Sequence, residues 1–316
     1  MVQEDRPAMA ARRAQSYNAC VASLRRIHKE LMILRVRWDD GRLVHEAGQY
    51  TVLGLGAWEP LIAGMQDEPG ETENQEQLVR RAYSFSCRLL DEQARLVGPA
   101  DEQEAEFYIT LAAQAPRRRP GLTPRLFCLR EADRLYVGPR ARGNYLLTGI
   151  APDQTVVLVA TGTGEAPHNA MVAQLLTQGH RGRIVTVTCV RQRQDLGYLA
   201  THRQLEQRFP NYRYLVLTTR EPENLDPAHP GYIGKQYLQE YFASGRLARD
   251  AGVPLAPGTT HVFLCGNPEM IGLPEHPRRR VGPMRSTRGM IQLLEEAGFQ
   301  IDRPQQPGNV HFERYW

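Results

Sequence analysis

The sequence predicts two domains of different fold class: an antiparallel β-barrel or sandwich over residues 16–150 and an α/β domain with a parallel sheet over residues 151–316. Three observations support this prediction. The length of 316 residues suits two domains more readily than one. Short β-prone stretches fill the first half, and strands alternate with helices after Ala151 and Pro152. We expect residues 1–15 to be a flexible extension.

Seven stretches of the first half have the alternating or β-branched pattern of strands, and Gly, Pro and Asp separate them. They are SYNACVASLRRIHKE (16–30), LMILRVRW (31–38), QYTVLGLG (49–56), AYSFSCRLL (82–90), EFYITLAA (106–113), RLYVGP (134–139) and NYLLTG (144–149). Many short strands with turn signals between them predict an antiparallel barrel or sandwich. Two acidic, turn-rich inserts, 65–77 and 91–106, interrupt the pattern, and we interpret both as solvent loops.

The second half alternates buried-looking strands with helices. The predicted strands are TVVLVAT (155–161), RIVTVTCV (183–190), YRYLVLTT (212–219) and HVFLCG (261–266). The predicted helices are APHNAMVAQLLTQG (166–179), YLATHRQLEQRF (198–209), KQYLQEYFASGRLARDAG (235–252) and RGMIQLLEEAG (288–298). This alternation predicts a parallel sheet covered on both faces. Ligands of such sheets bind beyond the carboxyl ends of the strands, so we expect the informative residues there.

The composition favours a protein of a reducing compartment. Five cysteines are scattered and never spaced as CxxC, which argues against a disulfide framework or a metal site: Cys20, Cys87, Cys128, Cys189 and Cys265. Every apolar run is shorter than the roughly 18 to 20 residues of a membrane helix. The N-terminus has no apolar signal-peptide core. We therefore expect a cytoplasmic protein without a membrane span, and nothing demands more than a monomer.

The charge pattern suits an acidic partner. The formal net charge of +4 is mild and does not establish nucleic-acid binding, which we do not expect. Two basic runs, Arg117–Arg119 and Arg278–Arg280, are typical of solvated loops. The functional alternative is a docking rim for an anionic protein.

The residues Thr161, Gly162, Thr163 and Gly164 directly follow a predicted strand and precede a predicted helix. Two glycines allow a sharp turn and a close backbone approach, and the helix start offers N–H groups to a pyrophosphate. The segment is not the GxGxxG fingerprint, because Pro167 stands in place of the third glycine, and no GK[S/T] follows. Taken alone, it is equally consistent with a plain strand-to-helix turn.

Other predicted strand ends strengthen the nucleotide hypothesis. Cys265 ends a strand, and Gly266 after it permits close backbone approach, although a free cysteine is usually a small buried apolar residue. Cations follow two further strands: Arg191, Arg193, Arg220 and, a little beyond, Lys235. Each alone is typical of a surface charge. Together they predict a clamp for a phosphate monoester, which favours NADP over NAD.

The segment RAYSFS (81–86) resembles the R-x-Y-S signature of flavin-binding reductases of the ferredoxin–NADP+ reductase family. The resemblance extends over nearly the whole chain, through EAGQYTVL, FYITL, GPRARGNYLL, VATGTGEAP, DLGYL, TREPEN, HVFLCGNPEM and the terminal HFERYW. The chain is similar to the bacterial type that ends in Tyr-Trp. The resemblance implies a six-stranded antiparallel Greek-key β-barrel that holds FAD, followed by a five-stranded parallel α/β module for NADP.

For the flavin, the resemblance implies that Arg81 neutralises the FAD pyrophosphate, that Tyr83 stacks on the isoalloxazine, and that Ser84 lies near its N5 and assists hydride transfer. Aromatic faces and a fixed arginine suit such a ligand. The other positions implied to bind FAD are Ala82 of the same motif, Tyr108, Ile109 and Thr110 on FYITL, Gly143, Asn144 and Tyr145 along the phosphates, Tyr315 over the nicotinamide face of the flavin, and Trp316 against the adenine.

For the nucleotide, the resemblance implies that Thr161 to Gly164 support the NADP pyrophosphate and that Arg191, Arg220 and Lys235 grip the 2′-phosphate. Lys235 departs from close relatives, in which arginine is more familiar. Cys265, with Gly266 beside it, would contact the nicotinamide edge, and Glu313 matches an acidic residue near the reacting centre. The implied catalytic residues are Ser84, Cys265, Glu313 and Tyr315.

The implied activity is that of an oxidoreductase, a flavoprotein of electron transport that couples NADP(H) to ferredoxin or flavodoxin through FAD. Two alternatives stay open. The reductase component of an oxygenase often carries a fused iron–sulfur domain with clustered cysteines, and none is visible. A flavin-binding regulatory subunit would be favoured by iron–sulfur ligands near the C-terminus, which are absent. Three parts of the chain depart from a compact family core: the two acidic inserts, the first 15 or so residues and LPEHPRRRVGP (273–283). They leave the identity of the electron carrier open.

Overall fold

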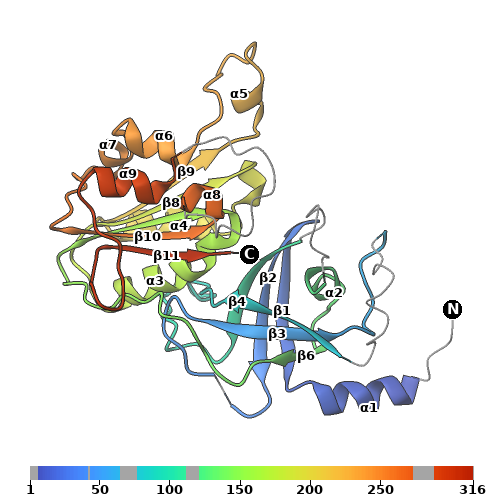
Figure 1. Ribbon diagram of the computed structural model, residues 1–316. Helices are drawn as coiled ribbons and strands as arrows, with labels where there is room; N and C mark the ends of the chain where they lie inside the picture. Colours follow the sequence, from blue (N-terminus) through green and yellow to red (C-terminus); the bar gives the residue numbers. More distant parts are fainter. Residues whose placement is uncertain (1–5, 42, 65–76, 112–120, 273–287, 316) are drawn as a thin grey trace. The chain divides into compact units, whose positions relative to one another are not determined.

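The computed structural model describes residues 6–41, 43–64, 77–111, 121–272 and 288–315. The chain divides into two compact units between Leu146 and Leu147, a few residues before the boundary expected from the sequence pattern. The first unit contains a six-stranded antiparallel sheet and the second a five-stranded parallel sheet, and Figure 1 shows the two sheets in the ribbon diagram. The predicted fold class, an antiparallel barrel-like domain followed by a parallel α/β domain, is confirmed.

The first unit is built from six antiparallel strands in the order β4-β3-β6-β1-β2-β5. Its elements are α1 (Arg6–Ser16), β1 (Ala19–His28), β2 (Leu31–Trp38), β3 (Tyr50–Gly56), β4 (Leu78–Ser84), β5 (Ala105–Thr110), α2 (Thr123–Leu126) and β6 (Arg134–Val137). Alternating residues of these strands, among them Leu34, Leu53 and Phe107, are fully buried in one hydrophobic core. Burial of one strand face is the expected source of stability for such a sheet.

Two expectations for the first unit differ from the structure. Residues 144–149 are irregular rather than a strand, because the chain passes there from one unit to the next. The strand expected over residues 82–90 spans Leu78–Ser84 instead. Leu89 beyond it has a left-handed φ of +68°, which a strand does not accommodate.

The N-terminal segment, expected to be a flexible extension, contains the helix α1. The side chain of Arg13 in this helix donates two hydrogen bonds to Glu59, and Tyr17 donates a third at 2.8 Å. Glu59 is almost fully buried, so these hydrogen bonds hold the end of α1 against the loop after β3.

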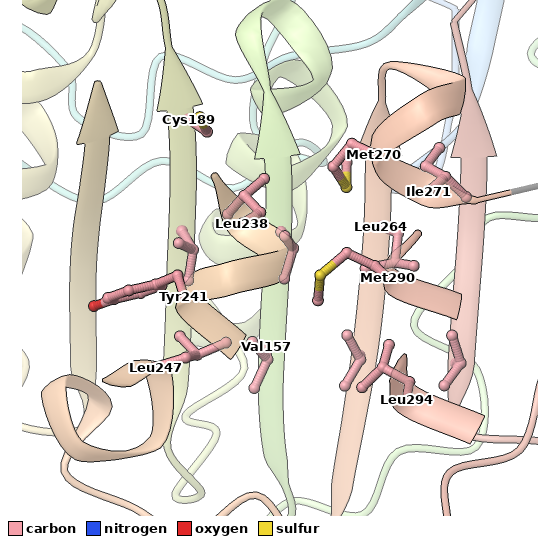
Figure 2. Packing of buried hydrophobic residues seen from close by; sticks show 14 of the residues in the cluster. Val157, Cys189, Leu238, Tyr241, Leu247, Leu264, Met270, Ile271, Met290 and Leu294 are labelled. Carbon is pink, nitrogen blue, oxygen red and sulfur yellow. The ribbon is translucent and has the colours of Figure 1, made fainter. Parts of the chain in front are cut away.

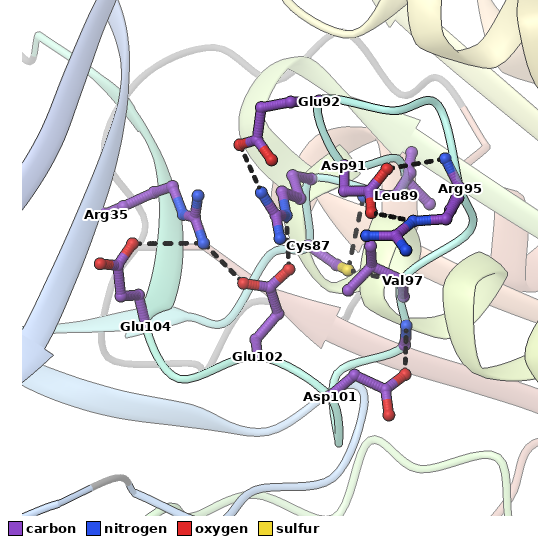
Figure 3. Close-up of polar contacts among 12 residues, drawn as sticks. Arg35, Cys87, Leu89, Asp91, Glu92, Arg95, Val97, Asp101, Glu102 and Glu104 are labelled. Carbon is purple, nitrogen blue, oxygen red and sulfur yellow. Dashed lines mark hydrogen bonds and ion pairs between the residues drawn. The ribbon is translucent and has the colours of Figure 1, made fainter.

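The second acidic insert, residues 91–106, is held to the barrel by ion pairs rather than free in solvent (Figure 3). Glu102 lies at the centre of this network. Its carboxylate accepts hydrogen bonds from Arg35 on β2 at 2.5 Å and from Arg88 at 2.6 Å. Val97 of the same insert is buried, so the segment is part of the domain surface layer. The first insert, over residues 65–77, lies almost entirely outside the described residues.

The second unit is a parallel sheet in the order β11-β10-β7-β8-β9. Its strands are β7 (Thr155–Thr161), β8 (Ile184–Val190), β9 (Tyr212–Thr218), β10 (Thr260–Gly266) and β11 (Val310–Arg314). Its helices are η2 (Gly162–Gly164), α3 (Glu165–Thr177), η3 (Arg193–Asp195), α4 (Leu199–Arg208), α5 (Pro222–Leu225), α6 (Leu238–Ala243), α7 (Arg246–Ala251), α8 (Pro268–Ile271) and α9 (Met290–Glu296).

Helices cover both faces of this sheet, as the strand pattern predicts. On one face, Val157 and Leu264 pack against Leu238 of α6 and against Met270 and Met290 of α8 and α9 (Figure 2). The opposite face packs against α3 and α4 and contains buried polar groups. Near-continuous apolar strands are typical of parallel sheets that are buried on both sides.

Two features of the second unit differ from the sequence expectation. The helix expected over residues 235–252 is divided into α6 and α7, because Gly245 takes a left-handed φ of +73° between them. The fifth strand, β11, lies in the segment HFER, which the strand-and-helix pattern did not identify. Its register with β10 aligns Cys265 with Glu313.

None of the helices within the described ranges combines the length and the apolar character that crossing a bilayer requires.

Candidate functional site

The segment from Thr161 to Gly164 forms a tight turn between β7 and α3. Gly162 has a φ of +53°, and a Cβ there would meet nothing within 4 Å. A Cβ on Gly164 would lie 2.4 Å from the carbonyl oxygen of Cys265, so the turn packs directly on the end of β10. The open side at Gly162 and the start of α3 make this turn a candidate site for an anionic group.

Position 266, at the end of β10, also requires glycine because a Cβ there has no room. Gly266 has a φ of +123°, and a Cβ there would lie 2.2 Å from the Thr161 hydroxyl oxygen. That hydroxyl accepts a hydrogen bond from the backbone N–H of Asn267 at 2.7 Å. The ends of β7 and β10 therefore pack closely against each other, and the Thr161 hydroxyl is engaged in a hydrogen bond within the protein.

Three predicted residues come together at the carboxyl ends of β10 and β11. Cys265 is aligned with Glu313, and the backbone N–H of Tyr315 donates to the Gly266 carbonyl at 3.0 Å. Burial raises the pKa of the Cys265 thiol well above its ordinary value, the Glu313 carboxylate raises it further, and a hydrogen bond with Tyr315 opposes both. The thiol therefore stays protonated, which disfavours a nucleophilic role. Trp316 lies outside the described residues.

Backbone hydrogen bonds join the three segments that carry the predicted clamp cations Arg191, Arg220 and Lys235. The N–H of Arg220 donates to the carbonyl of Arg191 at 2.8 Å, which joins the segments after β8 and β9. The N–H of Gln236, next to Lys235, donates to Thr218 at the end of β9 at 3.3 Å. All three side chains are exposed. The structure thus brings three cations to one corner of the sheet, as a phosphate-binding clamp requires.

Arg193, the fourth cation of this region, is placed differently. Its guanidinium lies 3.6 Å from the carboxylate of Glu223, and its backbone N–H donates to Glu221. Because an acidic partner already faces it, Arg193 is a weaker candidate for phosphate binding than Arg191 or Arg220.

In the first unit, the predicted flavin motif lies on β4. Strand alternation puts Arg81 and Tyr83 on one face of β4 and Ala82 and Ser84 on the other. Arg81 is exposed, whereas Ser84 is buried at the end of the strand. Tyr83 packs on the barrel core, and burial raises its pKa above the ordinary value. The motif thus offers an exposed cation and an aromatic ring on the same strand face.

The second predicted flavin segment, Tyr108 to Thr110, lies on β5. The chain just beyond β4 reaches this strand, because Ser86 donates its N–H to the carbonyl of Glu106 at 2.7 Å. Ile109 belongs to the barrel core, and Thr110 donates its hydroxyl to the Glu30 carbonyl at 3.2 Å. Tyr108 is also buried. The side chains of Ile109 and Thr110 are therefore engaged within the barrel.

The third predicted flavin segment, Gly143 to Tyr145, lies beside β3. A Cβ on Gly143, which has a φ of +108°, would lie 3.1 Å from the ring of Tyr50. Tyr50 in turn is aligned with Ser84 across the β3–β4 pair. The structure thus brings Gly143 near the Ser84 end of the flavin motif. Asn144 is exposed and Tyr145 is buried.

Three features of interest escape the sequence analysis. A Cβ on Gly121 would lie 3.3 Å from the Arg81 guanidinium, so the segment before α2 adjoins the flavin motif. The sequence signal that could have predicted this helix is Thr123-Pro124, because proline is favoured in the first turn of a helix. Three arginines, Arg80, Arg140 and Arg142, line a hollow of about 180 Å³ in the first unit. Glu165, directly after the turn at Gly164, is fully buried.

Within the described ranges, no group of three or more His, Cys, Asp or Glu side chains is arranged to hold a metal ion. The two basic runs, Arg117–Arg119 and Arg278–Arg280, lie outside the described residues.

Comparisons with known proteins agree with this arrangement. Residues 158–275 match the family described as the oxidoreductase NAD-binding domain. The flavodoxin/ferredoxin–NADP reductase of Escherichia coli is 28% identical over 226 residues, which cover 71% of this chain and 75% of that protein. The enzyme of the same name from Buchnera aphidicola is 24% identical over 268 residues, which cover 84% of this chain and 92% of that protein.

The fold is similar to that of a solved ferredoxin NADP+ reductase from Neisseria gonorrhoeae with bound FAD and NADP. The TM-score is 0.67 at 17% identity, and the match covers 95% of this chain and 98% of that one. The two units therefore share the fold of that structure, an antiparallel barrel-like sheet followed by a parallel α/β sheet. Over most of its length, the chain is thus similar to proteins named ferredoxin–NADP or flavodoxin/ferredoxin–NADP reductases.

Proposed function

We propose that this protein is an FAD-dependent oxidoreductase that transfers electrons between NADP(H) and ferredoxin or flavodoxin. The observation that supports it most strongly is the arrangement at the carboxyl edge of the parallel sheet. There the turn at Gly162, the strand end at Cys265 and the cations Arg191 and Arg220 follow neighbouring strands. The match to the oxidoreductase NAD-binding domain and the relatives named above support the same activity.

The residues of the first unit fit a flavin nucleotide. Arg81 is an exposed cation whose guanidinium lies beside Gly121, where a Cβ would crowd it, and such a cation suits a phosphate group. Tyr83, on the same strand face, offers a ring for stacking. When bound, FAD supplies the exchange between two-electron hydride chemistry and one-electron chemistry.

The residues of the second unit fit NADP(H). The turn at Gly162 would hold the pyrophosphate, and Arg191, Arg220 and Lys235 would hold the 2′-phosphate. The neutral thiol of Cys265 and the adjacent Glu313 would set the polarity around the nicotinamide and hold a proton there, without forming a covalent bond. The Tyr315 side chain, tied to Cys265, would orient that group.

The experiment that tests this proposal is NADPH-dependent dye reduction by the purified protein. The preparation is expected to be yellow and to reduce ferricyanide with NADPH. A colourless preparation that stays inert after FAD is added would contradict the proposal. Electron transfer to flavodoxin is expected to slow as salt is added, because acidic carriers meet basic surfaces by electrostatic steering.

Two further properties stay predictions. We expect a monomer, which sedimentation of the purified protein tests, and a cytoplasmic location, which fractionation of the source cells tests.

A further inference from the structure

Three arginines line the hollow of about 180 Å³ in the first unit, and neither the flavin nor the nucleotide assignment uses their side chains. Arg80 lies on β4, and Arg140 and Arg142 follow β6. The strands β4, β3 and β6, which are neighbours in the sheet (Figure 1), supply part of the lining. The segment after β6 supplies the rest.

The hollow lies on the opposite side of β4 from the predicted flavin motif. Neighbouring side chains of a strand point to opposite faces, so Arg80 points away from the face that carries Arg81 and Tyr83. Tyr83 packs on the barrel core, which places Arg80 on the outer face of the sheet. The hollow is therefore distinct from the surface that Arg81 and Tyr83 offer.

Tyr136 on β6 holds the Arg80 side chain in place. The guanidinium carbon of Arg80 lies 4.4 Å from the centre of the Tyr136 ring. Gly54 on β3 makes room for this contact, because a Cβ there would lie 3.2 Å from both side chains. A guanidinium that stacks on a ring keeps its N–H donors available to an acceptor beside the ring. Arg80 is thus oriented before a ligand arrives, which lowers the entropic cost of binding.

The other two arginines are carried by backbone that is anchored to β3. Arg142 and Tyr50 exchange two backbone hydrogen bonds, at 2.9 and 2.8 Å. The Thr51 hydroxyl donates a hydrogen bond to the carbonyl of Arg140 at 3.3 Å. The backbone that carries these arginines is therefore fixed, while both of their side chains are exposed.

The positive charge around the hollow is not balanced by a neighbouring carboxylate. Within the described part of the chain, no acidic side chain forms an ion pair with Arg80, Arg140 or Arg142. Other arginines of the same unit, such as Arg35 and Arg134, do pair with carboxylates. Three like charges around one concave surface raise the local potential and attract an anion.

The composition of the lining favours a phosphate group as that anion. Arginine forks match the oxygens of a phosphate, and a phosphate monoester carries a charge of about −1.5 to −2 at pH 7, more than a single carboxylate. Val52 and Pro139 give the rest of the lining an apolar character that suits attached carbon atoms. We propose that this hollow binds a phosphate group, as inorganic phosphate or as the phosphate monoester of a small molecule. This site is additional to the proposed function and does not depend on it.

The experiment is equilibrium dialysis of the FAD-loaded protein against radiolabelled inorganic phosphate at constant ionic strength. FAD is kept bound because Arg142 precedes Gly143, which is predicted to lie along the FAD phosphates. The parent chain carries Arg191→Ala and Arg220→Ala, so that the predicted 2′-phosphate clamp does not contribute. We expect one equivalent of phosphate to bind. Unlabelled glycerol 3-phosphate is then added as a competitor. If it displaces the label at a lower concentration than unlabelled phosphate does, the ligand is a monoester, and the reverse order indicates inorganic phosphate.

The variant that tests the hollow is Arg140→Gln combined with Arg142→Gln, which keeps the backbone hydrogen bonds to β3. It is expected to raise the dissociation constant of phosphate at least about tenfold, as the loss of charged hydrogen bonds would. If the double variant does not fold, Arg140→Gln alone is measured. Arg95→Gln is the matched control, because Arg95 is an exposed arginine of the same unit that already pairs with Asp91. It removes the same charge and should leave the constant unchanged.

Three results would overturn the inference. The first is a parent chain that binds no phosphate, or binds it only after FAD is removed, which would assign the hollow to the flavin. The second is an equal loss in the Arg95→Gln control, which would indicate a general effect of surface charge. The third is phosphate binding that is unchanged in the arginine variants while their electron transfer to flavodoxin slows, which would assign the hollow to carboxylates of the carrier. NADPH-dependent dye reduction by the wild type is measured separately, so none of these results bears on the proposed function.

Discussion

Gly164 lies so close to Cys265 that a Cβ on the glycine would come within 2.4 Å of the cysteine carbonyl oxygen. This contact ties the turn after β7 to the end of β10, and with it the candidate pyrophosphate site to the candidate nicotinamide site. Since the contacted atom belongs to the backbone, it cannot rotate away as a flexible side chain could.

We therefore expect Gly164→Ala to displace the turn. The free energy of unfolding should fall by about 1–3 kcal/mol, the usual cost of overpacking a tight contact, and NADP+ should bind more weakly. Urea denaturation and calorimetric titration measure the two effects. Gly258→Ala is the control, because a Cβ there meets nothing within 4 Å. An alanine at 164 that behaves like the alanine at 258 would show that the contact is not important.

Removing the clamp arginines should separate the two pyridine nucleotides. The double variant Arg191→Ala with Arg220→Ala is expected to have a lower kcat/KM with NADPH. The loss corresponds to about 1–3 kcal/mol of transition-state stabilisation for each charged hydrogen bond removed. The value with NADH should change little, because NADH has no 2′-phosphate. Dye reduction with each nucleotide gives both constants.

Arg193→Ala is the matched control for this pair. Arg193 is equally exposed and lies in the same corner, but it already faces Glu223. Its removal should leave the preference for NADPH intact. Equal losses with NADPH and NADH in the double variant would refute the clamp.

The sequence predicts the second unit better than the first, for a physical reason. The strand Thr155–Thr161 is buried on both faces and is apolar from Val156 to Ala160, so its pattern is easily recognised. The strand β11 is short and half-buried, and its segment HFER has no such pattern. Gly245 divides the helix expected over residues 235–252 through a positive φ that helix periodicity does not reveal.

Sequence reasoning located those candidate site residues that directly follow a strand, because the end of the strand fixes the position of the residue after it. Arg191 and Arg220 are brought together in this way, whereas Glu313, which pairs with Cys265, lies within β11 and was implied only by the resemblance. Contacts across loops could not be foreseen. Gly121 beside Arg81 depends on the path of a loop, and Glu165 with His202 depends on how α3 and α4 pack on the sheet.

The ion-pair network of the first unit should contribute to stability through Glu102. Glu102→Gln leaves the guanidinium groups of Arg35 and Arg88 without their shared carboxylate, which lies at the centre of the network in Figure 3. Only 17% of the Arg35 side chain and 25% of the Arg88 side chain are exposed. We expect a loss of about 1–3 kcal/mol in the free energy of unfolding, measured by urea denaturation.

Glu92→Gln is the matched control for Glu102→Gln. Glu92 also pairs with Arg88, but 73% of its side chain is exposed. An exposed ion pair of this kind contributes about 0–1 kcal/mol. Similar losses from both substitutions would contradict a special role of Glu102.

His168 should make the protein sensitive to acid. Burial lowers its pKa from 6.5 to about 3, so the folded protein keeps it neutral, whereas the unfolded chain takes up a proton below about pH 6.5. Stability is therefore lost as the pH falls from about 6.5 towards 3, by up to about 1.4 kcal/mol per pH unit. His168→Gln removes this proton uptake. Urea denaturation between about pH 7 and 5 should show a shallower slope for the variant, and identical slopes would contradict the prediction.

The most direct test of the central claim is rapid anaerobic mixing of the FAD-loaded protein with NADPH or NADH, followed by the yellow flavin colour. The account predicts that NADPH bleaches the flavin, that it does so faster than NADH, and that oxidised flavodoxin then restores the colour. A flavin that stays bound and yellow with both nucleotides would contradict it.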